Sequence, residues 1–353
     1  MNWVRPSVAA MQGYVPGFQP QPWDKYIKLN SNENPFPPSP KVQEMLGRLN
    51  YEELRLYPDP LSMELRQKLG ALYGFSENQI ICGNGSDDIL NIIVRTFVQP
   101  GEAIGFHEPT FPLYRILAIL HGANVISLPM REPFDQPPMP PPDLKIFFLA
   151  NPNSPVGFGF PTARVAEMAG KTKGVFVVDE AYAEFAREDA LALVRDLDNV
   201  IVVRTVSKSY SLAGVRLGYA IGQEKLIAEM LKVKDPFNVT RLSQTLVAAA
   251  LDDREYFYRT ISQIVETREW LTQEARAIGY RIIPSQANFI FPRPSREGEG
   301  VKFYEALFSR GVLTRYYDQE GIRDGVRMTI GKREEMLAVL QVMKEILPEF
   351  SNK

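Results

Sequence analysis

The chain has 353 residues, which is long for one hydrophobic core and predicts a large domain with a smaller one beside it. Its 40 lysines and arginines nearly balance its 42 aspartates and glutamates, and the net charge of -2 comes with no dense basic run that could hold a nucleic-acid backbone. We therefore expect no nucleic acid among its partners.

Cysteine and histidine are scarce in this sequence. Cys82 is alone and cannot close an internal disulfide. His107 and His121 are too isolated for a typical zinc site, so we expect no metal and interpret both as framework residues. The N-terminal residues include no apolar stretch of signal-peptide length, and nowhere do about 18 apolar residues follow one another. We expect a soluble cytoplasmic protein that does not bind membranes.

The first two thirds of the chain alternate short apolar runs with segments of helical period, a pattern typical of an α/β fold with a mostly parallel sheet wrapped by helices. Each run is followed by a polar or glycine-rich turn and predicts a buried strand. The candidate strands are residues 79–82, 103–106, 124–128, 144–150, 174–179 and 199–205. A proline-rich segment at 133–143 is interpreted as an exposed connection rather than a domain boundary.

From Asp252 onward the sequence predicts a second unit. A long segment with apolar residues at helical spacing stops at Gly279, which suits a helix C-terminal cap, and we expect it to bridge two domains. Residues 280–292, 311–317 and 325–331 are candidate strands. A final helix carries an apolar stripe of Met336, Val339, Leu340, Met343, Ile346 and Leu347. These elements predict a small α/β domain.

We expect three parts along the chain. Residues 1–30 are predicted to form an N-terminal arm that packs on the small domain and the active site. Residues 31–252 are predicted to form the large cofactor-binding domain, and residues 253–353 the small C-terminal domain.

Chemically distinctive residues follow several of the predicted strands. Ligands of open parallel sheets bind beyond the carboxyl ends of the strands, so such residues can converge. "GNGSDD" leads from a strand into a helix whose first amides can hold an anion, but it lacks the spacing of a dinucleotide site. "NPNSPVG", "DEAY" and "RTVSKSY" follow other strands with amides, a carboxylate and phenol, and a lysine. Together these motifs predict one pocket.

The residue types in this pocket favour pyridoxal 5'-phosphate. A lysine amine that forms an imine must be unprotonated part of the time, which low polarity and nearby positive charge promote. The cofactor offers the aldehyde, and its ring nitrogen needs an acid partner. Lys208 and Asp179 are the candidates for these two tasks. The cofactor phosphate is expected to bind Thr205, Ser207, Arg216 and the helix start at Ser86 and Asp87.

A series of motifs runs through nearly the whole chain in a fixed order: "LNSNENPFPPSP", "YPDP", "GNGSDDIL", "EPTFPLY", "NPNSPVG", "VVDEAY", "RTVSKSYSLAGVRLGY", "PFNV", "ANFIF" and "RMTIG". By this series the chain resembles the aspartate aminotransferase superfamily, fold type I of the pyridoxal-phosphate enzymes. Within it, the chain is most similar to histidinol-phosphate aminotransferases. Any one motif can arise by chance, but the series as a whole is specific.

The resemblance implies roles around the cofactor. Lys208 is implied to form the imine and to carry the proton, and Asp179 to bind the ring nitrogen. Tyr182 is implied to contact the phenolic oxygen of the ring, and Phe111 to stack on the ring face. Tyr57 of "YPDP" is implied to reach the cofactor phosphate of a neighbouring subunit, so the resemblance implies a homodimer.

The resemblance also implies a substrate-binding arginine. Arg327 of "RMTIG" matches the residue that grips the acidic end of the substrate, which is a phosphate in histidinol phosphate and a carboxylate in glutamate. Tyr14, Asn34 and Arg315 are candidates to assist it.

The sequence departs from the family at Ser154, where the family has an asparagine that bonds the ring oxygen. Either Asn153 takes over this contact or Tyr182 carries it alone.

The implied reaction converts L-histidinol phosphate and 2-oxoglutarate to imidazole-acetol phosphate and L-glutamate in histidine biosynthesis. The same fold also serves threonine-phosphate decarboxylases and aromatic amino acid aminotransferases, so both stay open. A more distant alternative is the effector-sensing module of transcription regulators, but these carry a helix-turn-helix domain for which the short N-terminal arm has no room.

Single residues have simpler interpretations when each is taken alone. Lys208 is then a solvated lysine, Asp179 a helix cap and Arg327 half of an ion pair.

Overall fold

The computed structural model describes residues 3–13, 16–21, 24–294 and 298–350. Its centre is a seven-stranded sheet in the order β2-β8-β7-β6-β5-β3-β4. The strands are β2 (Ile80–Gly83), β3 (Ala103–Glu108), β4 (Asn124–Pro129), β5 (Ile146–Ala150), β6 (Val175–Asp179), β7 (Val200–Thr205) and β8 (Gly218–Gly222). Every predicted strand of this region is present, and β8 is an addition that the sequence analysis missed.

The sheet is parallel from β4 to β7 and antiparallel only at β8. β3 pairs in parallel with both β4 and β5, and β6 pairs in parallel with both β5 and β7. β8 runs antiparallel to β7 and to β2. The predicted α/β fold with a mostly parallel sheet is therefore confirmed.

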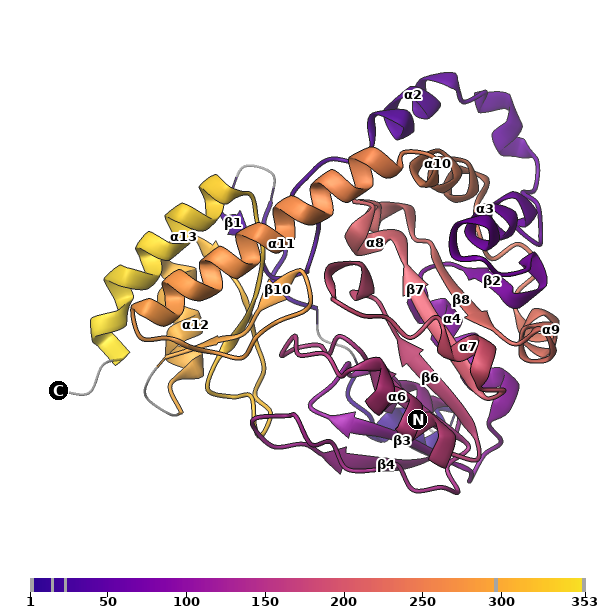
Figure 1. Cartoon of the computed structure of the whole chain (residues 1–353), viewed down its shortest axis with the longest axis horizontal. Helices are drawn as coiled ribbons and strands as arrows, with labels where there is room; N and C mark the ends of the chain where they lie inside the picture. The colour runs from indigo at the N-terminus through magenta and orange to yellow at the C-terminus, as the bar shows by residue number, and fades with distance from the viewer. Residues whose placement is uncertain (1–2, 14–15, 22–23, 295–297, 351–353) are drawn as a thin grey trace.

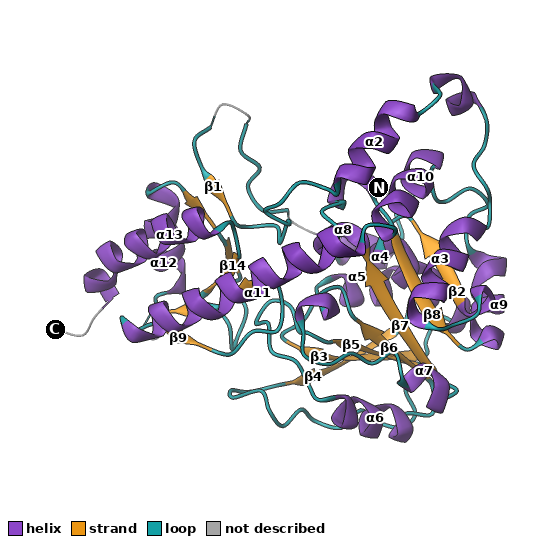
Figure 2. Cartoon of the chain, turned by 45° about the horizontal axis from the view of Figure 1, so that its top comes forward, coloured by secondary structure: helices purple, strands orange, loops and turns teal. Residues whose placement is uncertain are grey.

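Helices cover both faces of this sheet, and Figure 2 shows its strands side by side with helices flanking them. Every residue of β5, β6 and β7 is buried, as parallel strands between two helix layers require. Ile146 and Phe148 of β5 pack on one face, whereas Phe147 and Leu149 pack on the other. The first face is covered by α4 (Ser86–Phe97), α5 (Leu113–Leu120) and α9 (Glu224–Val233). The second is covered by α3 (Met63–Tyr73), α6 (Thr162–Lys171) and α10 (Arg241–Leu251).

The long helix α11 (Arg254–Ala277) joins this sheet to a smaller group of elements, and in Figure 1 it runs from α10 toward α13 (Arg333–Ile346). The predicted bridging helix is thus confirmed. The helix ends just before Gly279, whose φ of 114° lies in the region that glycine adopts without strain.

The smaller group combines two long helices with short strands. Its core includes the predicted stripe of α13, from Met336 to Ile346. Its elements are α12 (Gly300–Ser309), α13, β9 (Arg281–Ile282), β10 (Phe289–Ile290), β11 (Pro292–Arg293), β12 (Val312–Leu313), β13 (Arg315–Tyr316) and β14 (Val326–Thr329). β14 lies between β10 and β13 and is antiparallel to both.

The N-terminal segment contacts both parts of the molecule. α1 (Pro6–Ala10) lies against α5, and β1 (Ile27–Lys28) pairs in parallel with β12. After β1 the chain enters α2 (Pro40–Arg48). The short helices α7 (Leu193–Asp196) and α8 (Val206–Ser209) flank β7. The predicted boundaries at residues 30 and 252 stay predictions.

The proline-rich segment 133–143 is less exposed than expected. Phe134 is buried and stacks on Phe158 with 5.1 Å between ring centroids. Pro137 and Pro140 are buried as well. The expectation of an exposed connection is therefore wrong for these residues, because their apolar side chains anchor the segment beside the sheet.

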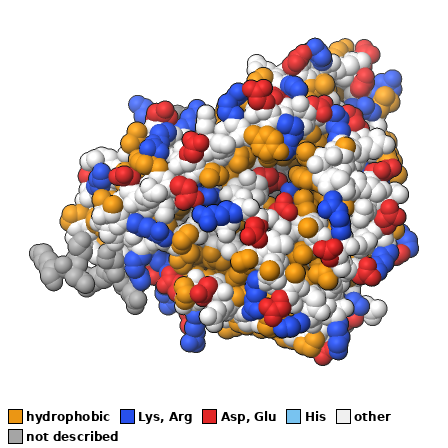
Figure 3. Space-filling model, viewed as in Figure 1, with side chains coloured by type: hydrophobic (Ala, Val, Ile, Leu, Met, Phe, Trp, Pro, Cys, Tyr) orange, Lys and Arg blue, Asp and Glu red, His pale blue; other side chains and the backbone are white. Residues whose placement is uncertain are grey.

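The surface and the helices give two further observations. On the face shown in Figure 3, side chains of both charges are intermixed among the described residues. None of the described helices has the length and apolar character needed to cross a lipid bilayer.

Candidate active site

A cavity of about 510 Å³ opens where β5, β6 and β7 end, at the carboxyl edge of the sheet. This is the position at which ligands of open parallel sheets bind. The predicted site residues that line it are Ser86, Asp87, Phe111, Asp179, Tyr182, Thr205, Ser207, Lys208, Arg216, Arg315 and Arg327. The fold therefore brings together residues that are more than 200 positions apart in the sequence.

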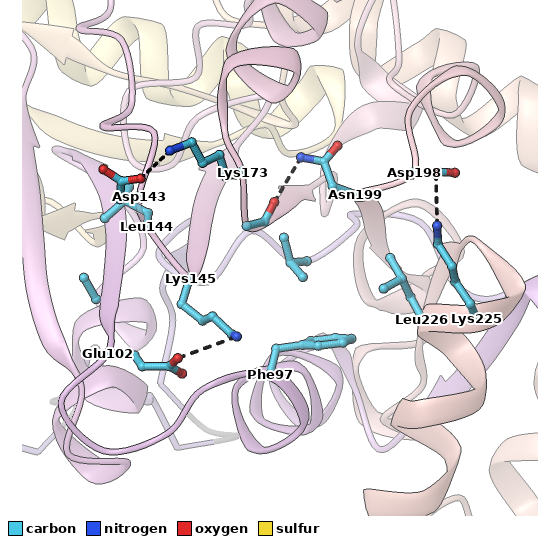
Figure 4. Close-up of a pocket in the computed structure, with 13 residues that line it drawn as sticks. Phe97, Glu102, Asp143, Leu144, Lys145, Lys173, Asp198, Asn199, Lys225 and Leu226 are labelled. Atoms are coloured by element: carbon cyan, nitrogen blue, oxygen red, sulfur yellow. Dashed lines mark hydrogen bonds and ion pairs between the residues drawn. The ribbon is translucent and has the colours of Figure 1, made fainter.

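A second cavity lies at the opposite, amino edge of the sheet and is shown in Figure 4. Its lining includes the apolar side chains of Phe97 and Leu226, and each of its lysines is paired with a carboxylate. The pairs are Lys145 with Glu102 at 3.6 Å, Lys173 with Asp143 at 2.8 Å and Lys225 with Asp198 at 3.0 Å. None of the predicted site residues lines this cavity, so the carboxyl edge is the candidate active site.

Lys208 reaches the first cavity because α8 begins directly after β7. Its Nζ donates a hydrogen bond to the backbone oxygen of Ser31 at 3.0 Å. Burial lowers the pKa of Lys208 to about 8, and the positive charges of Arg327 and Arg216 act in the same direction. The amine is therefore unprotonated to a useful extent near neutral pH, as a nucleophilic lysine requires.

Asp179 ends β6 and is only 6% exposed. Its Oδ2 accepts a hydrogen bond from the Tyr114 hydroxyl at 2.7 Å, and its Oδ1 accepts one from the backbone N–H of Ala181 at 3.2 Å. Burial raises the pKa of Asp179 to about 6, and the Tyr114 hydrogen bond is the largest effect opposing this rise. At neutral pH the carboxylate is mostly charged and can bind a positively charged N–H group.

An anion cradle lies between the start of α4 and the turn before β8. The first turn of α4, at Ser86, carries the partial positive charge of a helix N-terminus. Arg216 donates to Ser207 Oγ at 3.4 Å, and it lies 3.7 Å from a carboxylate oxygen of Asp87. Thr205 Oγ1 caps α8 by accepting from the backbone N–H of Ser207 at 3.1 Å.

The cradle depends on two glycines. A Cβ atom at Gly85 would lie 2.5 Å from Arg216 Nη2, and a Cβ atom at Gly218 would lie 2.3 Å from the Ser86 nitrogen. A side chain at either position would collide with Arg216 or with the backbone of Ser86. Glycine at both positions therefore allows the Arg216 guanidinium and the first amides of α4 to lie close together. This arrangement fits a phosphate group.

Two arginines form the other wall of the cavity. Arg315 of β13 is directly opposite Arg327 of β14 in the antiparallel pair. Arg327 donates to Asn30 O at 2.9 Å and to Ser154 Oγ at 3.3 Å, and its buried Nε has no hydrogen-bond partner among the described residues. Like charges on facing positions repel, so the pair favours a bound anion.

Tyr182 and Phe111 complete the lining. The Tyr182 hydroxyl accepts a hydrogen bond from Asn32 Nδ2 at 2.9 Å, which leaves its own proton free to donate into the cavity. Burial raises the pKa of Tyr182, so the hydroxyl stays protonated. Phe111 lies just before α5 and meets the Tyr114 ring edge-on at 5.8 Å.

Comparison with known proteins shows the family of this chain. Residues 24–343 match the family aminotransferase class I and II. The chain is 45% identical to histidinol-phosphate aminotransferase of Citrifermentans bemidjiense, over 98% of this chain and 99% of the relative. It is 46% identical to the enzyme of the same name from Geobacter sulfurreducens, over 97% of this chain and 99% of the relative. The chain belongs to the histidinol-phosphate aminotransferase family, within class I and II.

Solved structures show the same fold. The crystal structure of histidinol-phosphate aminotransferase from Sinorhizobium meliloti, in complex with pyridoxal-5'-phosphate, superimposes with a TM-score of 0.88 over 99% of both chains at 24% identity. An aspartate aminotransferase of Thermus thermophilus gives a TM-score of 0.81 at 19% identity, over 98% of this chain and 100% of that chain. The predicted fold is therefore confirmed.

Two residues that the family resemblance suggested do not face the cavity. The Asn153 amide donates to Pro109 O at 3.0 Å and accepts from the Val156 N–H at 3.2 Å, so it ties its own loop to the one that follows β3. Asn34 donates to the backbone oxygen of Lys208 at 2.9 Å and accepts from the backbone N–H of Phe36. Neither residue lines the cavity, so the ring-oxygen contact of Asn153 and the substrate contact of Asn34 stay predictions.

The remaining candidates lie elsewhere. Tyr57 is 77% exposed, stacks on Phe237 at 4.4 Å and does not line the cavity of its own chain. Tyr14 lies outside the described residues. His107 Nε2 donates to Pro138 O at 2.8 Å, and His121 caps the end of α5, so both are located in the framework of the fold.

Sequence reasoning missed Asn32 and Tyr114. Asn32 donates to the Tyr182 hydroxyl, and the Tyr114 hydroxyl donates to the Asp179 carboxylate. Both lie inside motifs that the sequence analysis quoted, "LNSNENP" and "EPTFPLY". Tyr114 follows Phe111 by three positions, a spacing that places both on one side of a helical turn. That spacing was a signal for Tyr114, but no local pattern points from Asn32 to Tyr182.

Proposed function

We propose that this protein is an aminotransferase that uses pyridoxal 5'-phosphate to convert L-histidinol phosphate and 2-oxoglutarate to imidazole-acetol phosphate and L-glutamate, a step of histidine biosynthesis. The observation that carries the proposal is one cavity in which the Lys208 amine, with its pKa lowered to about 8, shares space with Asp179 and the opposed arginines Arg315 and Arg327. The family membership supports the same reaction.

The cavity residues fit the cofactor. When bound, pyridoxal phosphate supplies an aldehyde that condenses with an amine and a ring that accepts the electrons of a breaking bond at the substrate Cα. Asp179 would bind the protonated ring nitrogen. Ser86, Ser207 and Arg216 would hold the phosphate together with Thr205 and Asp87, and Phe111 would cover the ring.

Tyr182 is proposed to donate its hydroxyl proton to the phenolic oxygen of the ring, since Asn32 occupies the accepting side of that hydroxyl. Ser154 Oγ accepts a hydrogen bond from Arg327 at 3.3 Å. Tyr182 therefore carries the ring oxygen without the asparagine that the family uses there.

Lys208 Nζ is the proposed base. It removes the proton from Cα of the amine substrate, and it can do so because burial and nearby arginines keep the amine partly unprotonated. The Ser31 carbonyl, 3.0 Å away, orients Nζ before the substrate arrives. The same nitrogen would then hold this proton until the proton is transferred to the cofactor.

Arg327 and Arg315 are proposed to bind the acidic end of each substrate. A phosphate monoester carries nearly two negative charges at neutral pH, which matches two guanidinium groups on facing strands. The carboxylate of 2-oxoglutarate would use the same pair in the second half-reaction. This shared use of one anion site explains how one pocket serves a phosphate and a carboxylate substrate.

The direct test is to incubate the purified protein and cofactor with L-histidinol phosphate and 2-oxoglutarate and to measure glutamate. We expect turnover that Lys208→Ala lowers by at least about 10⁴-fold, since the variant lacks the nucleophile and base. Absence of glutamate would overturn the proposal. Release of carbon dioxide from threonine phosphate, or faster turnover of phenylalanine, would instead assign one of the sister activities.

A further inference from the structure

Tyr114 is a buried polar residue beneath the active site to which the proposed reaction assigns no task. It lies in α5 and is 0% exposed, and its hydroxyl oxygen is 2.7 Å from Asp179 Oδ2. The inference about it rests on the proposed function, because it concerns how the cofactor is held.

The Tyr114 ring is fixed on several sides. It stacks on Phe148 of β5 with 4.8 Å between centroids and an interplanar angle of 7°. It meets Phe111 edge-on at 5.8 Å and Phe106 of β3 at 6.1 Å. The hydroxyl is thus held in place by a strand of the sheet rather than by a flexible loop, and Phe111 rests against the same ring.

The Asp179 carboxylate has one protein donor on each oxygen. Tyr114 must donate, because a carboxylate can only accept, and the Ala181 N–H serves the other oxygen at 3.2 Å. Two donors fix the plane of the carboxylate and leave further acceptor capacity toward the cavity. A ring N–H in the cavity would therefore meet an oxygen whose direction is already set.

The charges around Asp179 make the Tyr114 hydroxyl important. Burial raises the pKa of Asp179 to about 6, and Asp87 at the start of α4 raises it further. The hydrogen bond from Tyr114 is the largest opposing effect, followed by the Ala181 N–H. The hydroxyl of Tyr182, in the turn that follows β6, stays neutral because its pKa is raised by burial.

We propose that Tyr114 is a positioning residue that keeps Asp179 ionised and aimed at the ring nitrogen of the cofactor, and that supports the stacking ring of Phe111 from behind. The two tasks are separable: the hydroxyl serves Asp179 and the ring serves Phe111.

The test uses the apo-protein and measures cofactor affinity rather than activity. Tyr114→Phe removes the hydroxyl but keeps the ring. The dissociation constant of pyridoxal phosphate should rise about tenfold, as expected for one hydrogen bond to a charged group. Without the hydroxyl the pKa of Asp179 is higher, so the loss of affinity on acidification should begin at a higher pH than in the wild type.

An analogue of pyridoxal phosphate with carbon in place of the ring nitrogen isolates the mechanism. Wild type and Tyr114→Phe should bind this analogue equally well, because it offers nothing for the charge of Asp179 to bind. Tyr280→Phe is the matched control: that tyrosine is 3% exposed, its hydroxyl donates to Met343 O at 2.9 Å, and neither residue lines the cavity. It should lower the melting temperature but leave cofactor affinity unchanged.

Equal affinity and equal pH dependence of Tyr114→Phe and wild type would overturn the inference, and so would an equal loss for the cofactor and its carbon analogue. If Tyr114→Phe does not fold, 3-fluorotyrosine at position 114 replaces it. Its hydroxyl is a stronger donor and should move the acid loss of affinity to lower pH, so an unchanged profile would also overturn the inference. Failure of the wild-type protein itself to bind pyridoxal phosphate would instead reject the proposed function.

Discussion

At the scale of single residues, the protein environment shifts the pKa values of two side chains, Lys208 and Asp179, away from those of the same groups in water. A solvated lysine has a pKa of about 10.4 and is almost entirely protonated at neutral pH. Burial beside Arg327 and Arg216 lowers the pKa of Lys208 to about 8, whereas burial raises the pKa of Asp179 to about 6. The lysine thus loses its proton more easily and the aspartate still keeps its charge, which is the combination that an amine nucleophile and a cation-binding acid need.

The pKa of Lys208 predicts a pH profile for the apo-protein. The rate at which pyridoxal phosphate bonds covalently, followed by absorbance, should rise with pH through about 8 and level off above it, because only the neutral amine reacts. Arg327→Gln removes one positive charge and should move the midpoint to higher pH. Arg333→Gln, whose guanidinium packs over Trp270 at 3.4 Å, is the control and should leave the midpoint unchanged. An unmoved midpoint in Arg327→Gln would contradict the assigned cause.

At the scale of elements, the anion cradle depends on how closely β8 approaches the start of α4. β8 is the one strand of the large sheet that runs antiparallel to both neighbours, and its first residue, Gly218, lies against the Gly85–Ser86 backbone. A close backbone approach of this kind leaves no room for a side chain.

Gly218→Ala should therefore weaken pyridoxal phosphate binding by about tenfold or more and destabilise the fold by about 1–3 kcal/mol, since its Cβ would meet backbone atoms that cannot rotate away. Gly222→Ala lies in the same strand, and its Cβ would meet the side chains of Ile201 and Ile227 at 3.3 and 3.5 Å. That control should bind the cofactor normally. Titration of cofactor fluorescence and thermal unfolding check both variants, and equal cofactor affinity would refute the cradle's dependence on Gly218.

At the scale of the whole molecule, apolar side chains are exposed around the "YPDP" motif. The exposed fraction is 77% for Tyr57, 44% for Phe237 and 57% for Leu54. Leu56 and Leu61 beside them are also exposed. Clustered exposed apolar residues mark an interaction surface. We infer that this surface joins two copies of the chain in a homodimer and that Tyr57 enters the partner's cavity to contact the cofactor phosphate.

Mixing two inactive variants tests this dimer. Tyr57→Ala and Lys208→Ala subunits should each be inactive or nearly so as homodimers. In a mixed dimer, the cavity that keeps Lys208 receives an intact Tyr57 from the Lys208→Ala subunit, so one of the two sites is intact. Random mixing makes about half of all dimers mixed. Activity should therefore return to about a quarter of the wild-type value. No recovery after co-expression, with dimers present by light scattering, would show that Tyr57 acts in its own chain, and full activity of the Tyr57→Ala homodimer would show that Tyr57 has no role.

The sequence by itself determined where six buried strands of the large sheet lie along the chain, the long helix after Asp252, the helix start at Ser86 and the positions of Lys208 and Asp179 at strand ends. These features are local: a period of apolar residues reports burial, and a polar residue after a buried run reports a strand end. Parallel strands then bring their carboxyl ends to one edge, so the pocket could be predicted without knowing any contact.

Only the tertiary structure decided where side chains point and which distant groups they meet. It turned the Asn153 and Asn34 amides toward backbone atoms, gave β8 its antiparallel direction, and brought Asn32 to Tyr182 and Tyr114 to Asp179 across 150 and 65 positions of the chain. A hydrogen bond between residues so far apart depends on the packing of several elements at once, and no local period in the sequence encodes it.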